Sequence, residues 1–138
     1  MRDDITLLQR AERDFHTAMV MTENRGTDEL LLDIIAYHIH QGIEKCLKFN
    51  IQLAGGEFPH THEIKKLISV LDNAGESVPE WIVDNHEIIT EYATKTRYNT
   101  AVVGTIRENE KFLKLGLEYA ESLRKNEGTH SLKNIMNS

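Results

Sequence analysis

One segment of the chain has an apolar spacing that fits a long helix. Between residues 30 and 54, apolar side chains recur every three or four positions, so at about 100° per residue they share one broad face. These side chains belong to Leu32, Ile35, Ala36, Ile39, Ile43, Cys46, Leu47 and Ala54. A face of this length indicates a helix that packs against its neighbours from end to end.

The rest of the chain follows the same helical period. We expect further helices at about residues 4–23, 62–73, 78–95 and 100–125. No window alternates in the way that a strand does. The sequence therefore predicts an all-α fold, an up-and-down bundle of about five helices with two long central helices. Residues 1–126 would form this helical domain, and residues 127–138, which have few apolar side chains, a flexible C-terminal tail.

Residue types at the helix ends support these boundaries. Gly55 and Gly56 cannot sustain the second helix. Thr61 is a good N-cap for the third helix, and Asn99 or Thr100 can cap the fifth. Gly42 lies inside the second helix, where glycine costs up to about 1 kcal/mol relative to alanine. Its presence predicts that another helix crosses closely at this point.

Charge and cysteine content limit the partners and the compartment. The net charge is −6, so the long-range field does not attract nucleic acid, and any RNA contact needs a concentrated basic patch. Cys46 is the only cysteine, which excludes a disulfide within the chain and favours a reducing compartment. No apolar run approaches the roughly 20 residues that span a bilayer. We therefore expect a cytoplasmic protein with no membrane partner.

A polar stripe covers the opposite face of the second helix. It combines a phenol, an imidazole, an amide, a carboxylate and two ammonium groups, from Tyr37, His38, Gln41, Glu44, Lys45 and Lys48. Such a mixture is unusual for a solvated face and indicates a ligand-binding surface. An ordinary solvated face is the alternative interpretation.

Arg97 and Tyr98 lie at a break between the last two predicted helices. A guanidinium at this position suits a phosphate, because the following helix presents its N–H groups, and Tyr98 can stack on a base. Alternatively, Arg97 pairs with a carboxylate such as Glu44. The ligand-binding hypothesis requires that Arg97 and Tyr98 lie close to the polar stripe.

The seven histidines invite a metal hypothesis, with His38-x-His40 and His60-x-His62 as the candidate pairs. Residues two apart on a helix point about 200° from one another, so His38 and His40 cannot readily share an ion. No third ligand has a spacing that completes a site with His60 and His62. The sequence contains no glycine-rich phosphate loop after a strand. We therefore predict neither a metal site nor a cofactor.

Taken together, these residues resemble the HEPN family of small helical domains. The resemblance runs from about Leu8 to Tyr98 and rests on four stretches. They are Ala11-Glu12-Arg13-Asp14, His38-x-x-Gln41-x-x-Glu44-Lys45-x-x-Lys48, Phe58-Pro59-x-Thr61-His62-Glu63, and Tyr92 through Thr96-Arg97-Tyr98. The resemblance implies a bundle of about five helices that pairs into a homodimer, acts on nucleotides or RNA, and often travels with a minimal nucleotidyltransferase.

In the nuclease branch of the family, four to six intervening residues separate an arginine from a following histidine. The corresponding positions after Arg97 are Val102, Val103 and Gly104, so the histidine is missing. Arg10 and His16 satisfy the spacing, but they lie in the first helix, outside the place of the family motif. The resemblance therefore implies a HEPN protein without the catalytic motif.

Three functional hypotheses follow. The favoured one is a non-catalytic module that binds a nucleotide or RNA through the polar stripe with Arg97 and Tyr98, and pairs with a nucleotidyltransferase in a toxin–antitoxin-type system. The second is a metal-independent endoribonuclease that uses Arg97 with His38 or His62, since histidine can act as the general base on a ribose hydroxyl. The third is a structural dimerisation module with no ligand.

Overall fold

The computed structural model describes the backbone of residues 6–24, 30–98 and 105–137, and the side chains of residues 6–24, 31–94 and 105–127. These residues are helical almost throughout, with no strand among them. The helices are α1 Leu7–Asn24, α2 Leu30–Leu53, α3 Ile64–Asn73, α4 Glu80–Asp84, α5 His86–Tyr98 and α6 Ile106–Asn137. The predicted all-α fold is confirmed.

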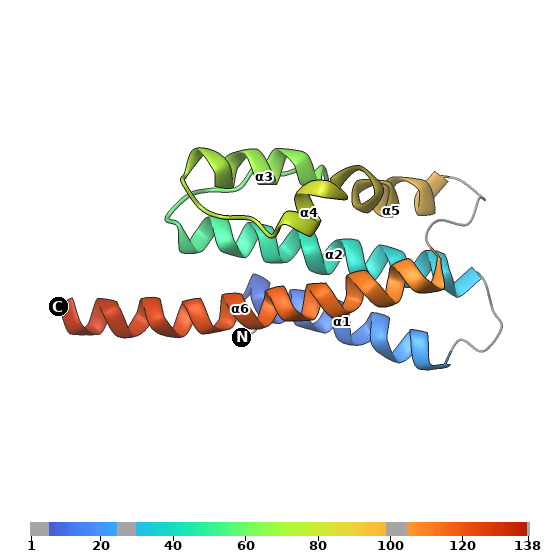
Figure 1. The fold of residues 1–138 in the computed structure, drawn as a ribbon, viewed down its shortest axis with the longest axis horizontal. Helices are drawn as coiled ribbons and strands as arrows, with labels where there is room; N and C mark the ends of the chain where they lie inside the picture. Colours follow the sequence, from blue (N-terminus) through green and yellow to red (C-terminus); the bar gives the residue numbers. More distant parts are fainter. Residues whose placement is uncertain (1–5, 25–29, 99–104, 138) are drawn as a thin grey trace.

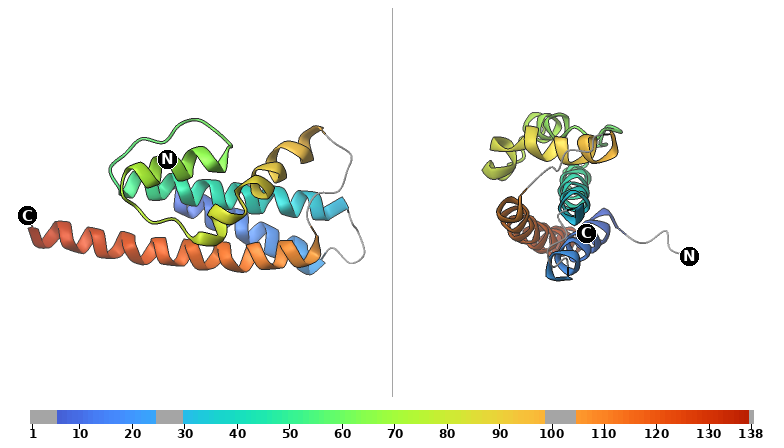
Figure 2. Two further views of the ribbon diagram at one scale, coloured as in Figure 1. Left: turned by 45° about the horizontal axis from the view of Figure 1, so that its top comes forward. Right: turned by 90° about the vertical axis from the view of Figure 1, so that its right-hand side faces the viewer.

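Helix α2 lies at the centre of the molecule. Figure 1 shows α1 and α6 along one side of α2, and α3, α4 and α5 along the other. The end-on view in Figure 2 shows the same arrangement, with α2 between the two groups. Accordingly, α2 packs against α1, α3, α5 and α6. Its apolar face is buried as predicted from Leu32 to Leu47, whereas Ala54 lies beyond the helix end and is exposed.

Phe15 of α1 explains the glycine inside α2. Its ring is fully buried between α2 and α6. A Cβ atom at Gly42 would lie 2.5 Å from the Phe15 ring, and one at Gly116 of α6 would lie 2.6 Å from it. Any larger side chain at either position would occupy the space of the ring. The predicted close helix crossing at Gly42 is therefore confirmed, and Gly116 serves the same purpose on the opposite side.

The predicted fourth helix, residues 78–95, is divided into α4 and α5 at Asn85. The Asn85 side-chain amide donates to the carbonyl oxygen of Trp81 at 2.7 Å, and the backbone at Asn85 leaves the helical region, with φ −117° and ψ 16°. An asparagine side chain competes with the backbone for such carbonyl groups, which favours a break. The described residues therefore form one more helix than predicted.

Capping side chains set the starts of the first and last helices, α1 and α6. Thr6 and Gln9 form a reciprocal capping box, because the Gln9 N–H donates to Thr6 Oγ1 at 3.1 Å and the Thr6 N–H donates to Gln9 Oε1 at 2.9 Å. The N–H of Glu108 donates to Thr105 Oγ1 at 3.1 Å, so α6 is capped by Thr105. The predicted caps Asn99 and Thr100 lie outside the described residues.

The C-terminal helix is longer than predicted. Its backbone stays helical to Asn137, past the expected end at about Lys125. Among its apolar side chains, Leu117 is 37% exposed, whereas Phe112 and Tyr119 are buried. The flexibility of residues 127–138 stays a prediction. No helix within the described ranges is long and apolar enough to span a membrane.

Candidate functional site

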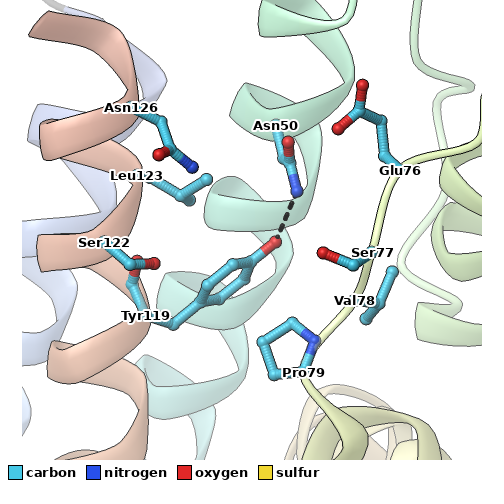
Figure 3. Close-up of a pocket in the computed structure, with 9 residues that line it drawn as sticks. All are labelled: Asn50, Glu76, Ser77, Val78, Pro79, Tyr119, Ser122, Leu123 and Asn126. Atoms are coloured by element: carbon cyan, nitrogen blue, oxygen red, sulfur yellow. Dashed lines mark hydrogen bonds between the residues drawn. The ribbon is translucent and has the colours of Figure 1, made fainter. Parts of the chain in front are cut away.

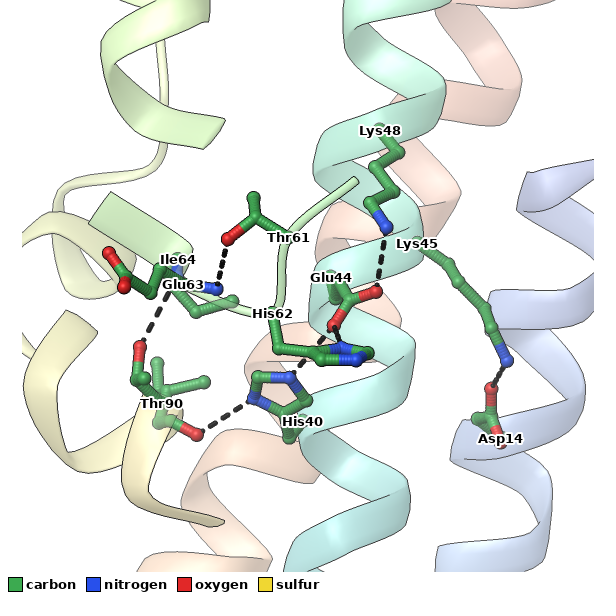
Figure 4. Close-up of polar contacts among 11 residues, drawn as sticks. Asp14, His40, Glu44, Lys45, Lys48, Thr61, His62, Glu63, Ile64 and Thr90 are labelled. Carbon is green, nitrogen blue, oxygen red and sulfur yellow. Dashed lines mark hydrogen bonds and ion pairs between the residues drawn. The ribbon is translucent and has the colours of Figure 1, made fainter. Parts of the chain in front are cut away.

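Three polar side chains meet beside the middle of α2. His40 and Glu44 lie one turn apart on the helix, and His62 comes from the loop that precedes α3 (Figure 4). Glu44 Oε1 lies 3.0 Å from His40 Nε2 and 2.9 Å from His62 Nδ1. His40 is fully buried and Glu44 nearly so, whereas the His62 side chain is 56% exposed. The cluster thus reaches from the protein interior to its surface.

Neighbouring elements hold the cluster in place. His40 Nδ1 donates to the carbonyl oxygen of Ile89 in α5 at 2.8 Å, because a carbonyl can only accept. The loop that carries His62 is tied to α5 as well, since the N–H of Ile64 donates to Thr90 Oγ1 at 3.2 Å. Thr61 Oγ1 accepts the N–H of Glu63 at 3.0 Å, so α3 begins later than its predicted cap implied.

Glu44 is ionised although it is buried. Burial raises the pKa of its carboxyl, but hydrogen bonds from His40, His62 and Lys48 outweigh this effect and lower the pKa to about 2. Lys48 Nζ donates to the second carboxylate oxygen, Oε2, at 2.9 Å. Glu44 is therefore an anion at neutral pH, and both of its oxygens have partners among the described side chains.

A second carboxylate organises the other edge of the stripe. Asp14 of α1 accepts from Lys45, and its Oδ1 lies 3.1 Å from His38 Nδ1. Burial raises the pKa of Asp14, but the hydrogen bonds from His38 and Lys45 prevail, and the net shift is downward. His38 therefore faces α1 and His40 faces α5, as expected for residues two apart on a helix.

The structure separates the predicted ligand-binding residues into groups. Tyr37, His38, Gln41 and Lys45 are half-buried along α2, and the ammonium of Lys48 lies 5.2 Å from the centroid of the Phe58 ring. Glu44 is 4% exposed. It is therefore a buried organising group and not part of an open polar face. The charged members of the predicted stripe are paired with one another and with Asp14.

Arg97 and Tyr98 form the last turn of α5, and their side chains lie outside the described residues. Their backbone lies far from Lys48. Helix α5 runs antiparallel to α2 from the contact between Ile89 and His40 (Figure 1). From that contact, Lys48 and Arg97 each lie eight residues further along their helices, about 12 Å in opposite directions at the α-helical rise. The expected convergence of these two residues is not found.

A match to a family model connects this geometry to known proteins. The HEPN domain model matches residues 6–127, which is most of the chain. The chain belongs to the HEPN domain family. No curated protein and no solved structure matches it significantly. HEPN membership places the chain among modules that act on nucleotides or RNA.

The structure describes the two histidines of the alternative nuclease hypothesis, whereas the side chain of Arg97 lies outside the described residues. The two alternative catalytic histidines lie on different sides of α2. His38 contacts Asp14, and His62 contacts Glu44. His62 is the more exposed of the two, and a carboxylate orients its ring. Such an imidazole can act as a general base, but no described arginine side chain accompanies it.

Sequence reasoning considered His40 only together with His38 and missed its pairing with Glu44. Its importance lies in the spacing His40-x-x-x-Glu44, which places both side chains on one face of a helix, one turn apart. The candidate histidine pairs were two residues apart in the sequence, whereas His40 contacts Glu44, four residues away. The contribution of His62 is visible only in the fold, because eighteen residues and a loop separate it from Glu44.

A polar pocket of about 220 Å³ lies between the C-terminal half of α2, the loop before α4, and α6 (Figure 3). Asn50 donates to the hydroxyl of Tyr119 at 3.0 Å across its floor. Its lining is uncharged except for Glu76, so it lacks the cations that bind a phosphate. The pocket lies away from the His40–Glu44–His62 cluster and is not part of it.

Proposed function

We propose that this HEPN protein binds a nucleotide or RNA through the half-buried polar edge of α2 alone, without the Arg97 and Tyr98 that the sequence-based hypothesis required, and does not cleave it. The observation that carries the proposal is that two lysines on adjacent turns, Lys45 and Lys48, are held in position by carboxylates on either side (Figure 4). An ammonium group has three donors, so each lysine retains capacity for a phosphate oxygen. The half-buried ring of Tyr37 offers a stacking surface on the same helix.

The charge balance of this surface favours local recognition over long-range attraction. Asp14 and Glu44 offset the two lysines, and the whole chain is acidic. With about two phosphate contacts to a single strand, the slope of log K against log salt would be about −1.4. Such a surface suits a nucleotide or an RNA end better than a long duplex.

We test the proposal by fluorescence anisotropy with labelled single-stranded RNA and by calorimetric titration with nucleotides. The double variant Lys45→Ala/Lys48→Ala is compared with Lys65→Ala/Lys66→Ala, which removes two exposed lysines of α3. We expect the first variant to lose about tenfold or more in affinity, or roughly 1.4 kcal/mol, and the second to change it little. Flat titrations of wild type with all ligands, or equal losses in both variants, would favour a structural module.

Endoribonuclease activity is the second candidate function. It is favoured by the exposed side chain of His62, which contacts the carboxylate of Glu44. Wild type, His62→Ala and Arg97→Ala are each incubated with RNA in the presence of chelator. Our proposal expects no cleavage by any of them. Cleavage by wild type that both substitutions abolish would replace the binding proposal with the nuclease.

We also propose a homodimer and a nucleotidyltransferase partner in a toxin–antitoxin-type system, on the strength of HEPN membership. Light scattering at micromolar concentration is expected to give the mass of a dimer. Co-expression with a minimal nucleotidyltransferase encoded by an adjacent reading frame is expected to yield a stable complex. A monomer in the first experiment and separate elution in the second would contradict these two proposals.

A further inference from the structure

We propose that His40 Nε2, Glu44 Oε1 and His62 Nδ1 bind a divalent transition-metal ion of the zinc class. The proposal goes beyond nucleotide or RNA binding and does not depend on it. The three atoms all lie within 4.8 Å of one another. Two imidazole nitrogens and one carboxylate oxygen are a ligand set that zinc commonly takes, with a further position for water.

The distances fit a metal ion after a small adjustment. The carboxylate oxygen lies 3.0 Å and 2.9 Å from the two nitrogens. Metal–ligand bonds of about 2.1 Å in tetrahedral geometry separate two ligand atoms by about 3.4 Å. The carboxylate oxygen therefore needs to move only a few tenths of an ångström away from each nitrogen, and the two nitrogens lie within 4.8 Å of each other. The exposed His62 can make this adjustment without disturbing the core.

The hydrogen bond from His40 to α5 supports metal binding most directly. Because Nδ1 donates to the Ile89 carbonyl, Nε2 is the ring nitrogen that faces Glu44 and the centre of the cluster. A backbone carbonyl on the remote ring nitrogen is the usual outer partner of a metal-binding histidine.

The charges around the cluster permit a cation. Glu44 is ionised and supplies the negative charge. Lys48 contacts the other carboxylate oxygen, Oε2, and leaves Oε1 to the two histidines. The ammonium of Lys48 weakens the binding of a cation. Because two of the three ligands are imidazole nitrogens, the site should prefer zinc-class metals over Mg²⁺ or Ca²⁺. The ion would connect the loop before α3 to the middle of α2.

The test uses the full-length, tag-free chain and the metal alone. Zn²⁺ content is measured after dialysis, and Co²⁺ binding is followed by visible absorption, which reports tetrahedral coordination. We expect one ion per chain and a rise of several degrees in the melting temperature with Zn²⁺. His62→Ala should abolish the Co²⁺ absorption band, whereas His60→Ala, a neighbouring histidine of the same loop, should retain it.

A variant that replaces one metal ligand by another tests whether the loss of Co²⁺ binding in His62→Ala is due to misfolding. His62→Cys places a thiol at the exposed position, and Co²⁺ should then show a sulfur-to-metal charge-transfer band that wild type lacks. Absence of Zn²⁺ and Co²⁺ binding to folded wild type would overturn the proposal. Binding that survives His62→Ala, or a His62→Cys variant without the charge-transfer band, would overturn it as well.

Discussion

At the scale of single residues, the core depends on a contact that no pattern of apolar residues reveals. The ring of Phe15 occupies the space that side chains at Gly42 and Gly116 would fill. Glycine lowers the helix propensity of both segments, so the packing of Phe15 must outweigh that loss. Asp14 is a second such residue, because its carboxylate contacts His38 and Lys45 and so joins α1 to the polar side of α2.

Gly42→Ala is expected to destabilise the fold by about 1–3 kcal/mol, although alanine is the better helix former. The new methyl group would lie 2.5 Å from a ring that Gly116 prevents from moving away. Urea denaturation measures the effect. In a double-mutant cycle, Phe15→Leu should remove much of the penalty of Gly42→Ala. Additive losses would show that the ring is not the obstacle.

Asp14→Asn is expected to lower stability by about 1–2 kcal/mol at neutral pH. The pKa of Asp14 is lowered in the folded state, so its carboxylate stabilises the fold above the ordinary pKa of about 3.9. That contribution is lost as the pH falls through the lower, folded-state pKa. The difference between wild type and variant should therefore shrink below about pH 4. The free energies of unfolding of wild type and Asp14→Asn are measured by denaturation from neutral pH to below pH 4. Asp72→Asn, at an exposed position, is the control.

At the scale of elements, local side-chain chemistry decides where helices begin and break. Asn85 divides a continuous apolar pattern into α4 and α5 by bonding to the Trp81 carbonyl. Thr6 and Thr105 start α1 and α6 through their hydroxyl groups. Thr90 of α5 supplies an acceptor for the first turn of α3, which a reading of the α3 sequence alone cannot anticipate.

Thr105→Ala is expected to cost about 1 kcal/mol, because it removes the acceptor for the N–H of Glu108 at the start of α6. Thr105→Ser, which keeps the hydroxyl, should stay close to wild type. Thermal unfolding of the three proteins gives the comparison. Equal melting temperatures for wild type and Thr105→Ala would mean that the capping bond contributes nothing.

At the scale of the whole molecule, the central position of α2 determines what the chain can do. Its apolar face packs against α1 and α6, while His40 and Glu44 face α5 and the loop before α3. From the contact between His40 and Ile89, α5 runs in the opposite direction to α2, so its last turn, which contains Arg97, lies away from Lys48.

The sequence by itself determined the all-α class, the central helix, its buried face and the HEPN family. These follow from the helical period and from local residue types, which act over a few positions of the chain. Only the tertiary structure decided that Phe15 fills the space beside Gly42, and that His62 reaches Glu44. Such contacts depend on how helices and loops distant in sequence are placed against one another, and no spacing within one helix encodes that placement.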